Sequence, residues 1–255
     1  MTNRIDHDNA HNFTFGFLST IHAPLLPFTL EAALTNGCNN IIVICDSKLP
    51  SEKDTRIWQE RTGGAFEKMD NTSTNIYSFG HSMIPFYFVD SHNSTQTIDI
   101  IKSMGIDCLF NAGTPRKLST RIIHSVEYGV VNVHPGLLPE YRGCTCVEWA
   151  IYNDDKIGNT AHFMDEGYDT GPIITSEWYE FPENADYQSI RVKVYREGCL
   201  LAGRVLGAIK TNRIRPADVL QQNPAQAKSW SPISDKEMAL VFRKLQDSKY
   251  RYQVL

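Results

Sequence analysis

The sequence predicts an α/β protein with a Rossmann-like, mostly parallel twisted sheet that is covered by helices on both faces. Apolar runs typical of strands alternate with helical patterns as far as His134. The β-branched run at residues 40–46 (NIIVICD) is typical of a strand buried on both faces. Repeated strand–helix–strand units favour parallel pairing, and ligands then bind beyond the carboxyl ends of the strands.

The individual elements follow from local patterns. Gly37 and Gly105 are natural helix stops, and the segment 69–82 is polar without a clear period, which favours a loop. We expect strands at 13–19, 40–46, 86–90, 108–111 and 130–134, and helices at 27–36, 51–61, 95–104 and 116–126.

The pattern changes after His134. A short helix is expected at 148–152, followed by strands at 160–164 and 172–179. A long amphipathic helix is expected at 186–210, because its apolar residues recur at helical spacing. We therefore expect a catalytic domain over residues 1–210 and a C-terminal extension over residues 211–255, the latter with a helix at 235–245 and a tail.

Composition excludes several classes of protein. A chain of 255 residues can bury a core without a disulfide or metal staple. The net charge of −4 disfavours a nucleic-acid surface. The six cysteines lack metal-ligand spacing, so we predict no metal site and a cytoplasmic location. We predict no membrane span and no signal peptide, because no apolar run is long enough and residues 1–12 are polar.

The segment 131–143 (VNVHPGLLPEYRG) carries the first candidate active-site residues. Asn132 and His134 project to the same side of a strand end, because strand side chains alternate. Each has a structural alternative, as a turn-forming asparagine or a hydrogen-bonded histidine. His124 and His162 are both expected to be structural.

The segment 160–174 (TAHFMDEGYDTGPII) supplies an acidic loop from which Asp169 could reach His134. An amide and an imidazole can stabilise the oxyanion that forms when an amine attacks a formamide-like carbon. A carboxylate can move the proton and would also hold the imidazole charged. Asp169 could instead be a turn residue, and spacing alone leaves a hydrolase or a lyase possible.

The motif from Asn132 to Gly143, followed by DEGYDTGP from Asp165, resembles the signature of folate-dependent formyltransferases. The resemblance implies N10-formyltetrahydrofolate as the donor and Asn132, His134 and Asp169 as the catalytic residues. It also implies a folate site in a turn and in the acidic loop. Its residues are Thr114, Pro115, Arg116, Leu118, Met164, Asp165 and Tyr168.

The acceptor follows from finer features of the resemblance. Glycinamide ribonucleotide formyltransferases carry a glycine-rich phosphate loop where residues 19–24 have no glycine, and tRNA formyltransferases usually carry a second basic domain. The length, Pro135-Gly136 and Trp149 are most similar to sugar N-formyltransferases, which act on nucleotide-linked amino sugars for bacterial surface polysaccharide such as O-antigen. Methionyl-tRNA and glycinamide ribonucleotide remain alternative acceptors, and a hydrolytic relative is a third reading.

Contacts to that acceptor and between subunits can also be predicted. The candidate substrate contacts are Thr20, His22, His92, Asn93 and Arg142, the last for a diphosphate. Trp230, the helix segment 238–242 and the alternating tail 250–254 offer apolar surface, which predicts a homodimer.

Overall fold

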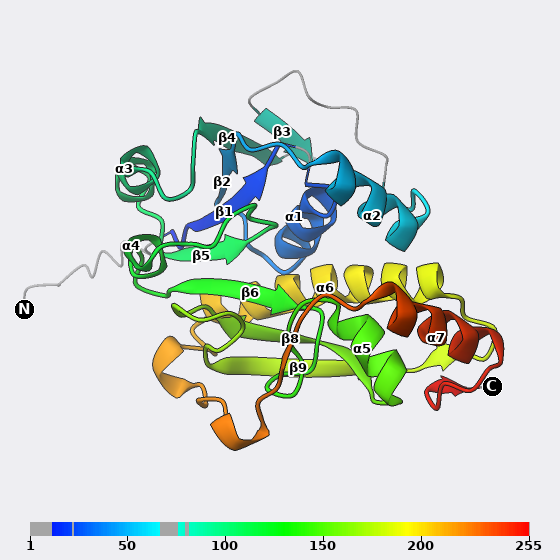
Figure 1. The fold of residues 1–255 in the computed structure, drawn as a ribbon. Helices are drawn as coiled ribbons and strands as arrows, with labels where there is room; N and C mark the ends of the chain where they lie inside the picture. The colour runs from blue at the N-terminus through cyan, green and yellow to red at the C-terminus, as the bar shows by residue number, and fades with distance from the viewer. Residues whose placement is uncertain (1–11, 22, 67–75, 80–81, 255) are drawn as a thin grey trace, which may run out of the picture.

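Eight strands form one mixed sheet in the computed structural model, which describes residues 12–21, 23–66, 76–79 and 82–254. In chain order they are β1 (Phe15–Thr20), β2 (Ile41–Asp46), β3 (Ile76–Phe79), β4 (Ser82–Val89), β5 (Cys108–Asn111), β6 (Val130–His134), β8 (Ile157–Phe163) and β9 (Ile173–Tyr179). Their spatial order is β3-β4-β2-β1-β5-β6-β8-β9. Strands β4, β2, β1, β5 and β6 run parallel, and β3, β8 and β9 are antiparallel to their neighbours. The predicted fold class is confirmed (Figure 1).

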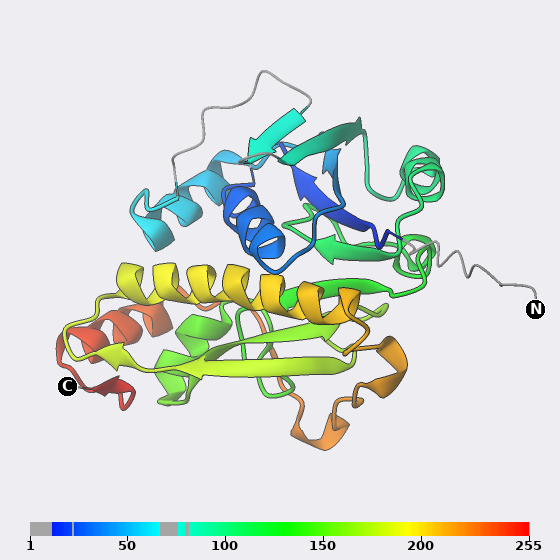
Figure 2. The same ribbon diagram turned by 180° about the vertical axis from the view of Figure 1, so that it is seen from behind.

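Strand alternation divides the core between the two faces of this sheet. Phe15 and Phe17 pack with α1 (Leu26–Thr35) and α6 (Tyr187–Lys210), which lie side by side on one face (Figure 2). Leu18 points to the opposite face, in a cluster with residues of α3 (Thr95–Ser103) and α4 (Thr120–Ile123). Burial on both faces explains why the central strands read as continuous apolar runs.

A third apolar cluster joins the C-terminal residues to the rest of the protein. Val241 and Leu245 of α7 (Asp235–Gln246) and the buried Tyr250 pack with α5 (Cys146–Asn153). Short strands add backbone pairing: β11 (Ser229–Trp230) pairs with β7 (Arg142–Gly143), and β12 (Gln253–Val254) pairs with β10 (Phe181–Pro182). Two 3-10 turns, at Pro216–Asp218 and Pro224–Gln226, complete this region. The extension therefore folds back beside β7, the short strand that follows β6 in the chain.

Two expected elements differ from the structure. The helix predicted at 116–126 is confined to Thr120–Ile123, because the preceding residues form a turn tied to neighbouring loops. The predicted loop at 69–82 contains β3 and the start of β4, although residues 67–75 and 80–81 lie outside the described residues. A short edge strand is stabilised by backbone bonds to one neighbour and needs no apolar alternation.

The remaining helix, α2 (Glu52–Thr62), agrees with its sequence signals. Ser51 and Asp54 form a reciprocal capping box, and Gly63 ends the helix in the left-handed region at φ 54°. Among the described helices, none combines the length and apolar character needed to cross a bilayer.

Candidate active site

The structure brings Asn132, His134 and Asp169 together at the carboxyl end of β6. Asp169 follows β8 in the acidic loop, and its Oδ1 lies 3.5 Å from Nδ1 of His134. The same oxygen lies 3.7 Å from Nε2 of His162, which is 3.1 Å from Nδ2 of Asn132. His162 thus stands between the amide and the carboxylate, and the sequence prediction of a purely structural role missed it.

Asp169 is held in one orientation by the backbone. Its φ of 55° lies in the left-handed region, and its Oδ2 accepts a hydrogen bond of 2.9 Å from the Gly143 N–H. Burial alone would raise the pKa of the Asp169 carboxyl, but its pKa lies below the ordinary value. The Gly143 N–H stabilises the ionised form, and a proton taken up by the ring of His162 or His134 stabilises it further. The carboxyl is therefore ionised at neutral pH, with Oδ1 turned toward the two imidazoles.

His134 is neutral in this setting, contrary to the charged imidazole expected from the sequence. The side chain is buried, and desolvation lowers the pKa of His134 even though Asp169 acts in the opposite direction. Its Nε2 lies 2.7 Å from the Tyr141 carbonyl oxygen, which can only accept, so Nε2 carries the hydrogen. Nδ1 then presents a lone pair to the Asp169 carboxylate, and the two atoms together form a site for one proton.

A directed chain of hydrogen bonds fixes the Asn132 amide. Backbone N–H groups of Gly113 and Thr114 donate to Oδ1 of Asn111, so Nδ2 of Asn111 must be the donor to Oδ1 of Asn132 at 3.0 Å. Nδ2 of Asn132 then donates to Nε2 of His162, whose Nδ1 donates to the Phe163 carbonyl. The second hydrogen on Nδ2 of Asn132 stays available for a ligand.

The antiparallel pairing of β6 with β8 explains why His162 was missed. Asn132 and His162 are direct partners in this register, as are His134 and Thr160. A mostly parallel sheet was expected from the sequence, and only the antiparallel register places these side chains opposite each other. Period-two alternation from Thr160 was the one available signal.

Every residue predicted to contact the folate lines one cavity of about 280 Å³. Thr114, Pro115, Arg116 and Leu118 form one wall, and Met164, Asp165 and Tyr168 of the acidic loop form another. Asn132 and His162 lie at its base. We call this space the donor cavity, and its role in binding folate stays a prediction at this point.

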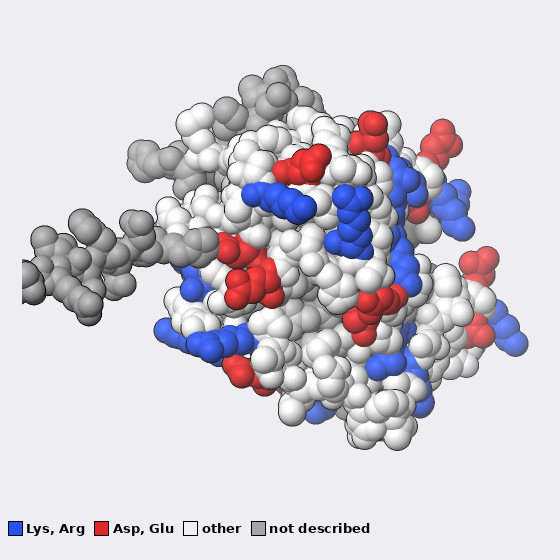
Figure 3. Space-filling model, turned by 90° about the vertical axis from the view of Figure 1, so that its left-hand side faces the viewer, with Lys and Arg blue, Asp and Glu red and all other residues white. Residues whose placement is uncertain are grey.

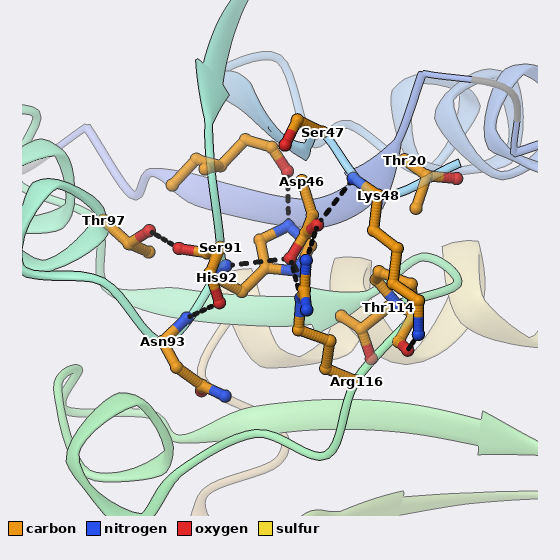
Figure 4. A network of polar contacts seen from close by, with 12 residues as sticks. Thr20, Asp46, Ser47, Lys48, Ser91, His92, Asn93, Thr97, Thr114 and Arg116 are labelled. Carbon is orange, nitrogen blue, oxygen red and sulfur yellow. Dashed lines mark hydrogen bonds and ion pairs between the residues drawn. The ribbon is translucent and has the colours of Figure 1, made fainter. Parts of the chain in front are cut away.

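The turn that lines the donor cavity is tied to two neighbouring loops, and Figure 4 shows the bonds between Arg116 and Asp46. Nε and Nη2 of Arg116 donate to the buried Asp46 at the end of β2, at 2.9 and 3.2 Å. Asn93 bonds the backbone on either side of Leu118: its Nδ2 donates to the Lys117 carbonyl, and its Oδ1 accepts from the Ser119 N–H. The side chain of Arg116 therefore anchors the turn while its backbone faces the cavity.

Several predicted acceptor contacts have other partners. His92 is fully buried; its backbone N–H bonds Asp46 and its Nε2 lies 2.9 Å from the Ile44 carbonyl, so the prediction of a substrate contact is wrong. Asn93 is occupied by the donor-side turn, and Arg142 donates twice to Oε1 of Gln222, at 3.0 and 2.6 Å. Asn93 thus has its partners on the donor-side turn. Arg142 uses only two of its five N–H donors on Gln222, so its contact with an acceptor stays a prediction. His22 lies outside the described residues.

Two larger cavities meet the site from the other side. One, of about 890 Å³, is lined by Thr20, Lys48, Trp58, Tyr195 and also Asn132. The other, of about 1690 Å³, begins at His134 and Pro135 and continues past Arg61, Arg191 and Phe242. The two share Pro135, Trp58 and Tyr195, and we call them together the acceptor cleft. Asn132 lines both the donor cavity and the acceptor cleft, as do Asn111, Thr114 and Pro115. Among the described residues, no group of three His, Cys, Asp or Glu side chains could hold a metal ion.

Comparisons with known proteins agree with this arrangement. The family model described as formyl transferase matches residues 23–199. A methionyl-tRNA formyltransferase from Clostridium tetani is 28% identical over 147 residues, which cover 57% of this chain and 46% of that protein. The chain thus spans about half the length of this relative.

Solved structures share the fold at low sequence identity. A glycinamide ribonucleotide transformylase from Symbiobacterium toebii aligns with a TM-score of 0.57 and 18% identity, covering 84% of this chain and 96% of that one. An N-formyltransferase from Helicobacter canadensis, in complex with folinic acid and dTDP-3-aminofucose, aligns with a TM-score of 0.54 and 16% identity, covering 86% and 71%. Since the family model covers more than half of the sequence, the chain belongs to the formyl transferase family.

Proposed function

We propose that this protein transfers a formyl group from N10-formyltetrahydrofolate to the amine of a nucleotide-linked amino sugar. The observation that carries the proposal is that Asn132 lines both the donor cavity and the acceptor cleft. A group-transfer enzyme needs two ligands whose reacting atoms meet at one point, and proximity of that kind contributes several kcal/mol to lowering a barrier. The product would serve bacterial surface polysaccharide synthesis in the cytoplasm.

The side chains support a direct transfer without a covalent enzyme intermediate. The acceptor nitrogen attacks the formyl carbon, a C–N bond forms, and the free Nδ2 hydrogen of Asn132 stabilises the resulting oxyanion. The proton released by the amine goes to the site between Asp169 Oδ1 and His134 Nδ1. The bond from carbon to N10 then breaks, and this proton is returned to the leaving nitrogen.

The acceptor cleft supports a nucleotide-linked sugar by its size and lining. Trp58 and Tyr195, whose ring centroids lie 4.9 Å apart, give the cleft an aromatic lining for a base, and Lys48 and Lys53 offer cations for phosphates. The Helicobacter canadensis structure is a complex with such a ligand, dTDP-3-aminofucose. Figure 3 shows one face on which lysine and arginine side chains lie among aspartate and glutamate, and the net charge is −4. Neither feature favours a large polyanion such as tRNA.

The second candidate acceptor is methionyl-tRNA, because the curated relatives that match the sequence are named for it. Glycinamide ribonucleotide is the third, through the Symbiobacterium toebii structure. Incubation with N10-formyltetrahydrofolate and a panel of GDP-, dTDP- and UDP-linked amino sugars, methionyl-tRNA and glycinamide ribonucleotide separates them by the formyl mass gain. Gain only on methionyl-tRNA would replace the sugar proposal with the tRNA one.

The catalytic assignment predicts the effect of three substitutions. Asn132→Ala, His134→Ala and Asp169→Ala should each lower kcat by about 10²-fold or more, because each removes a donor or proton acceptor at the reacting carbon. Turnover is measured with the acceptor found by the panel, and folding by circular dichroism. Asp218→Ala, at an exposed carboxylate in the extension, is the control and should keep wild-type kcat. Wild-type rates in all three variants would rule out this site.

A further inference from the structure

Gln222 of the C-terminal extension lies directly behind the catalytic carboxylate. Its Nε2 donates to the carbonyl oxygens of Asp169, at 2.9 Å, and Gly171, at 2.7 Å. Its Oε1 accepts both hydrogen bonds from Arg142. The side chain is 9% exposed, although the residues on either side of it are exposed.

These contacts use the whole hydrogen-bonding capacity of one amide. Nε2 has two hydrogens and both are donated, while Oε1 has two lone pairs and both accept. Carbonyl oxygens only accept and a guanidinium only donates, so the amide cannot be turned over. Among side chains of this length, only the glutamine amide carries a nitrogen with two hydrogens and a carbonyl oxygen on the same carbon.

The two segments that Gln222 joins are the two that fix the Asp169 carboxylate. Asp169 provides the carboxylate from a left-handed backbone conformation, which is unfavourable for a residue with a Cβ. Gly143, next to Arg142, provides the N–H that holds Oδ2. Gly171 is equally constrained, because a Cβ there would lie 1.9 Å from the Phe163 carbonyl oxygen.

Further backbone contacts bring the extension to this place. The Ile173 N–H donates to the Leu220 carbonyl at 3.2 Å, next to the acidic loop. The pairing of β7 with β11 holds the extension against the second segment, because Arg142 and Gly143 align with Ser229 and Trp230. Residues 220–230 therefore connect the acidic loop to the Arg142–Gly143 strand. Gln222 is the buried residue of this stretch.

We propose that Gln222 is a positioning residue of the reaction, and that the C-terminal extension completes the catalytic centre by holding the Asp169 loop against the Arg142–Gly143 strand. This inference rests on the proposed function, since it assigns the acid–base step to Asp169. Gln222 bonds the backbone of Asp169 and Gly171 and the side chain of Arg142. It therefore acts on the reaction only through the position of Asp169.

Gln222→Glu is the sharpest test, because it keeps the shape and the acceptor for Arg142 but replaces the two-hydrogen donor by an oxygen facing two carbonyls. Gln222→Ala removes both sets of bonds. Each variant should lower kcat by about 10- to 100-fold, the effect of a small misplacement of a reacting group, and leave KM for the acceptor within about threefold. Gln221→Ala, the exposed neighbour of the same type, should stay within about twofold of wild type.

Rates are expressed per folded molecule, measured by circular dichroism, so that a loss of folded protein is not counted. Wild-type kcat in Gln222→Glu, or an equal loss in Gln221→Ala, would overturn the inference. A second readout needs no turnover: the NMR titration of His134 should shift to lower pH in Gln222→Ala, because the Asp169 carboxylate that raises the pKa of His134 has moved away. An unchanged titration would also overturn it. Absence of formyl transfer by the wild type would instead refute the proposed function, and the titration would still decide the role of Gln222.

Discussion

The Asp169–His134 pair shows at the residue scale how burial decides a protonation state. Both Nε2 of His134 and Nδ1 of His162 donate outward to carbonyl groups, so both rings turn lone pairs inward. Asn132 satisfies the lone pair of His162, and that of His134 faces Asp169 Oδ1. The site is thereby ready to receive a proton rather than to give one.

This arrangement predicts the titration of His134. Its pKa should lie below the ordinary value of about 6.5, because burial disfavours the charged ring. Asp169→Asn should lower the pKa of His134 further, since the carboxylate that partly offsets burial is removed. The measurement is the chemical shift of the His134 Hε1 proton against pH, assigned by its loss in His134→Gln. A value above 6.5 in the wild type would contradict the neutral ring.

The same shifts set the direction of acid denaturation. The pKa values of both His134 and Asp169 are lowered in the folded state, so the unfolded chain takes up their protons first as pH falls. The free energy of unfolding therefore begins to fall through His134 as pH drops below about 6.5, the pKa of an unfolded histidine. The contribution of Asp169 is lost at lower pH, below the pKa of an unfolded aspartate. The two effects add in the same direction.

At the scale of elements, the turn at residues 114–118 is shaped by side chains distant in sequence. Asp46 ends β2, Asn93 follows β4, and both hold the turn from behind. Bidentate recognition of a carboxylate by an arginine fixes direction as well as distance. The donor cavity therefore depends on the spacing of three loops at one edge of the sheet.

Arg116→Ala should weaken donor binding more than folding. Asp46 keeps its backbone donors at Lys48 and His92, so the free energy of unfolding should fall only modestly. The freed turn should raise KM for N10-formyltetrahydrofolate about tenfold while kcat changes little. Urea unfolding and steady-state kinetics measure the two effects. Arg121→Ala, at an exposed arginine of α4, is the control, and an equal rise in KM there would refute the anchoring role.

The elements differ in how well the sequence predicted them. Strand β2 was expected at 40–46 and runs over Ile41–Asp46, because a strand buried on both faces leaves an unbroken apolar run. Strand β3 was missed because an edge strand leaves no such pattern. Asn132, His134 and Asp169 follow from a motif local in sequence, whereas His162 and Gln222 depend on pairing register and on a chain return, which no local pattern contains.

At the scale of the whole molecule, the C-terminal extension packs against the rest of the same chain. Less of its apolar surface is therefore left for a second subunit than the sequence indicated. Trp230 stacks on Tyr141 with ring centroids 5.5 Å apart, and Tyr250 is fully buried. Tyr250 is therefore not available as apolar surface for a second subunit, and one face of the partly buried Trp230 is covered within the chain. The tail forms the short strand β12, and the apolar surface remaining on α7 is at Leu240 and Phe242, each over 40% exposed.

The predicted homodimer should therefore depend on α7. Leu240→Asp, outside the cleft lining, should shift a dimer to monomer, because a charge would be buried in the contact. Sedimentation velocity at several concentrations measures the change. Leu200→Asp, at a similarly exposed leucine of α6, should leave the assembly unchanged. A wild-type monomer at all concentrations would refute the dimer.

The donor cavity and the acceptor cleft share lining residues, and this has a consequence for inhibition. Asn111, Thr114, Pro115 and Asn132 line both spaces, so two ligands bound there as proposed could be joined through a short linker. A joined molecule loses its translational and rotational freedom once rather than twice, and the second half binds at the high effective concentration that a short tether imposes. Its affinity would approach the product of the two separate affinities, and a linker too short to span the two bound ligands would lose that gain.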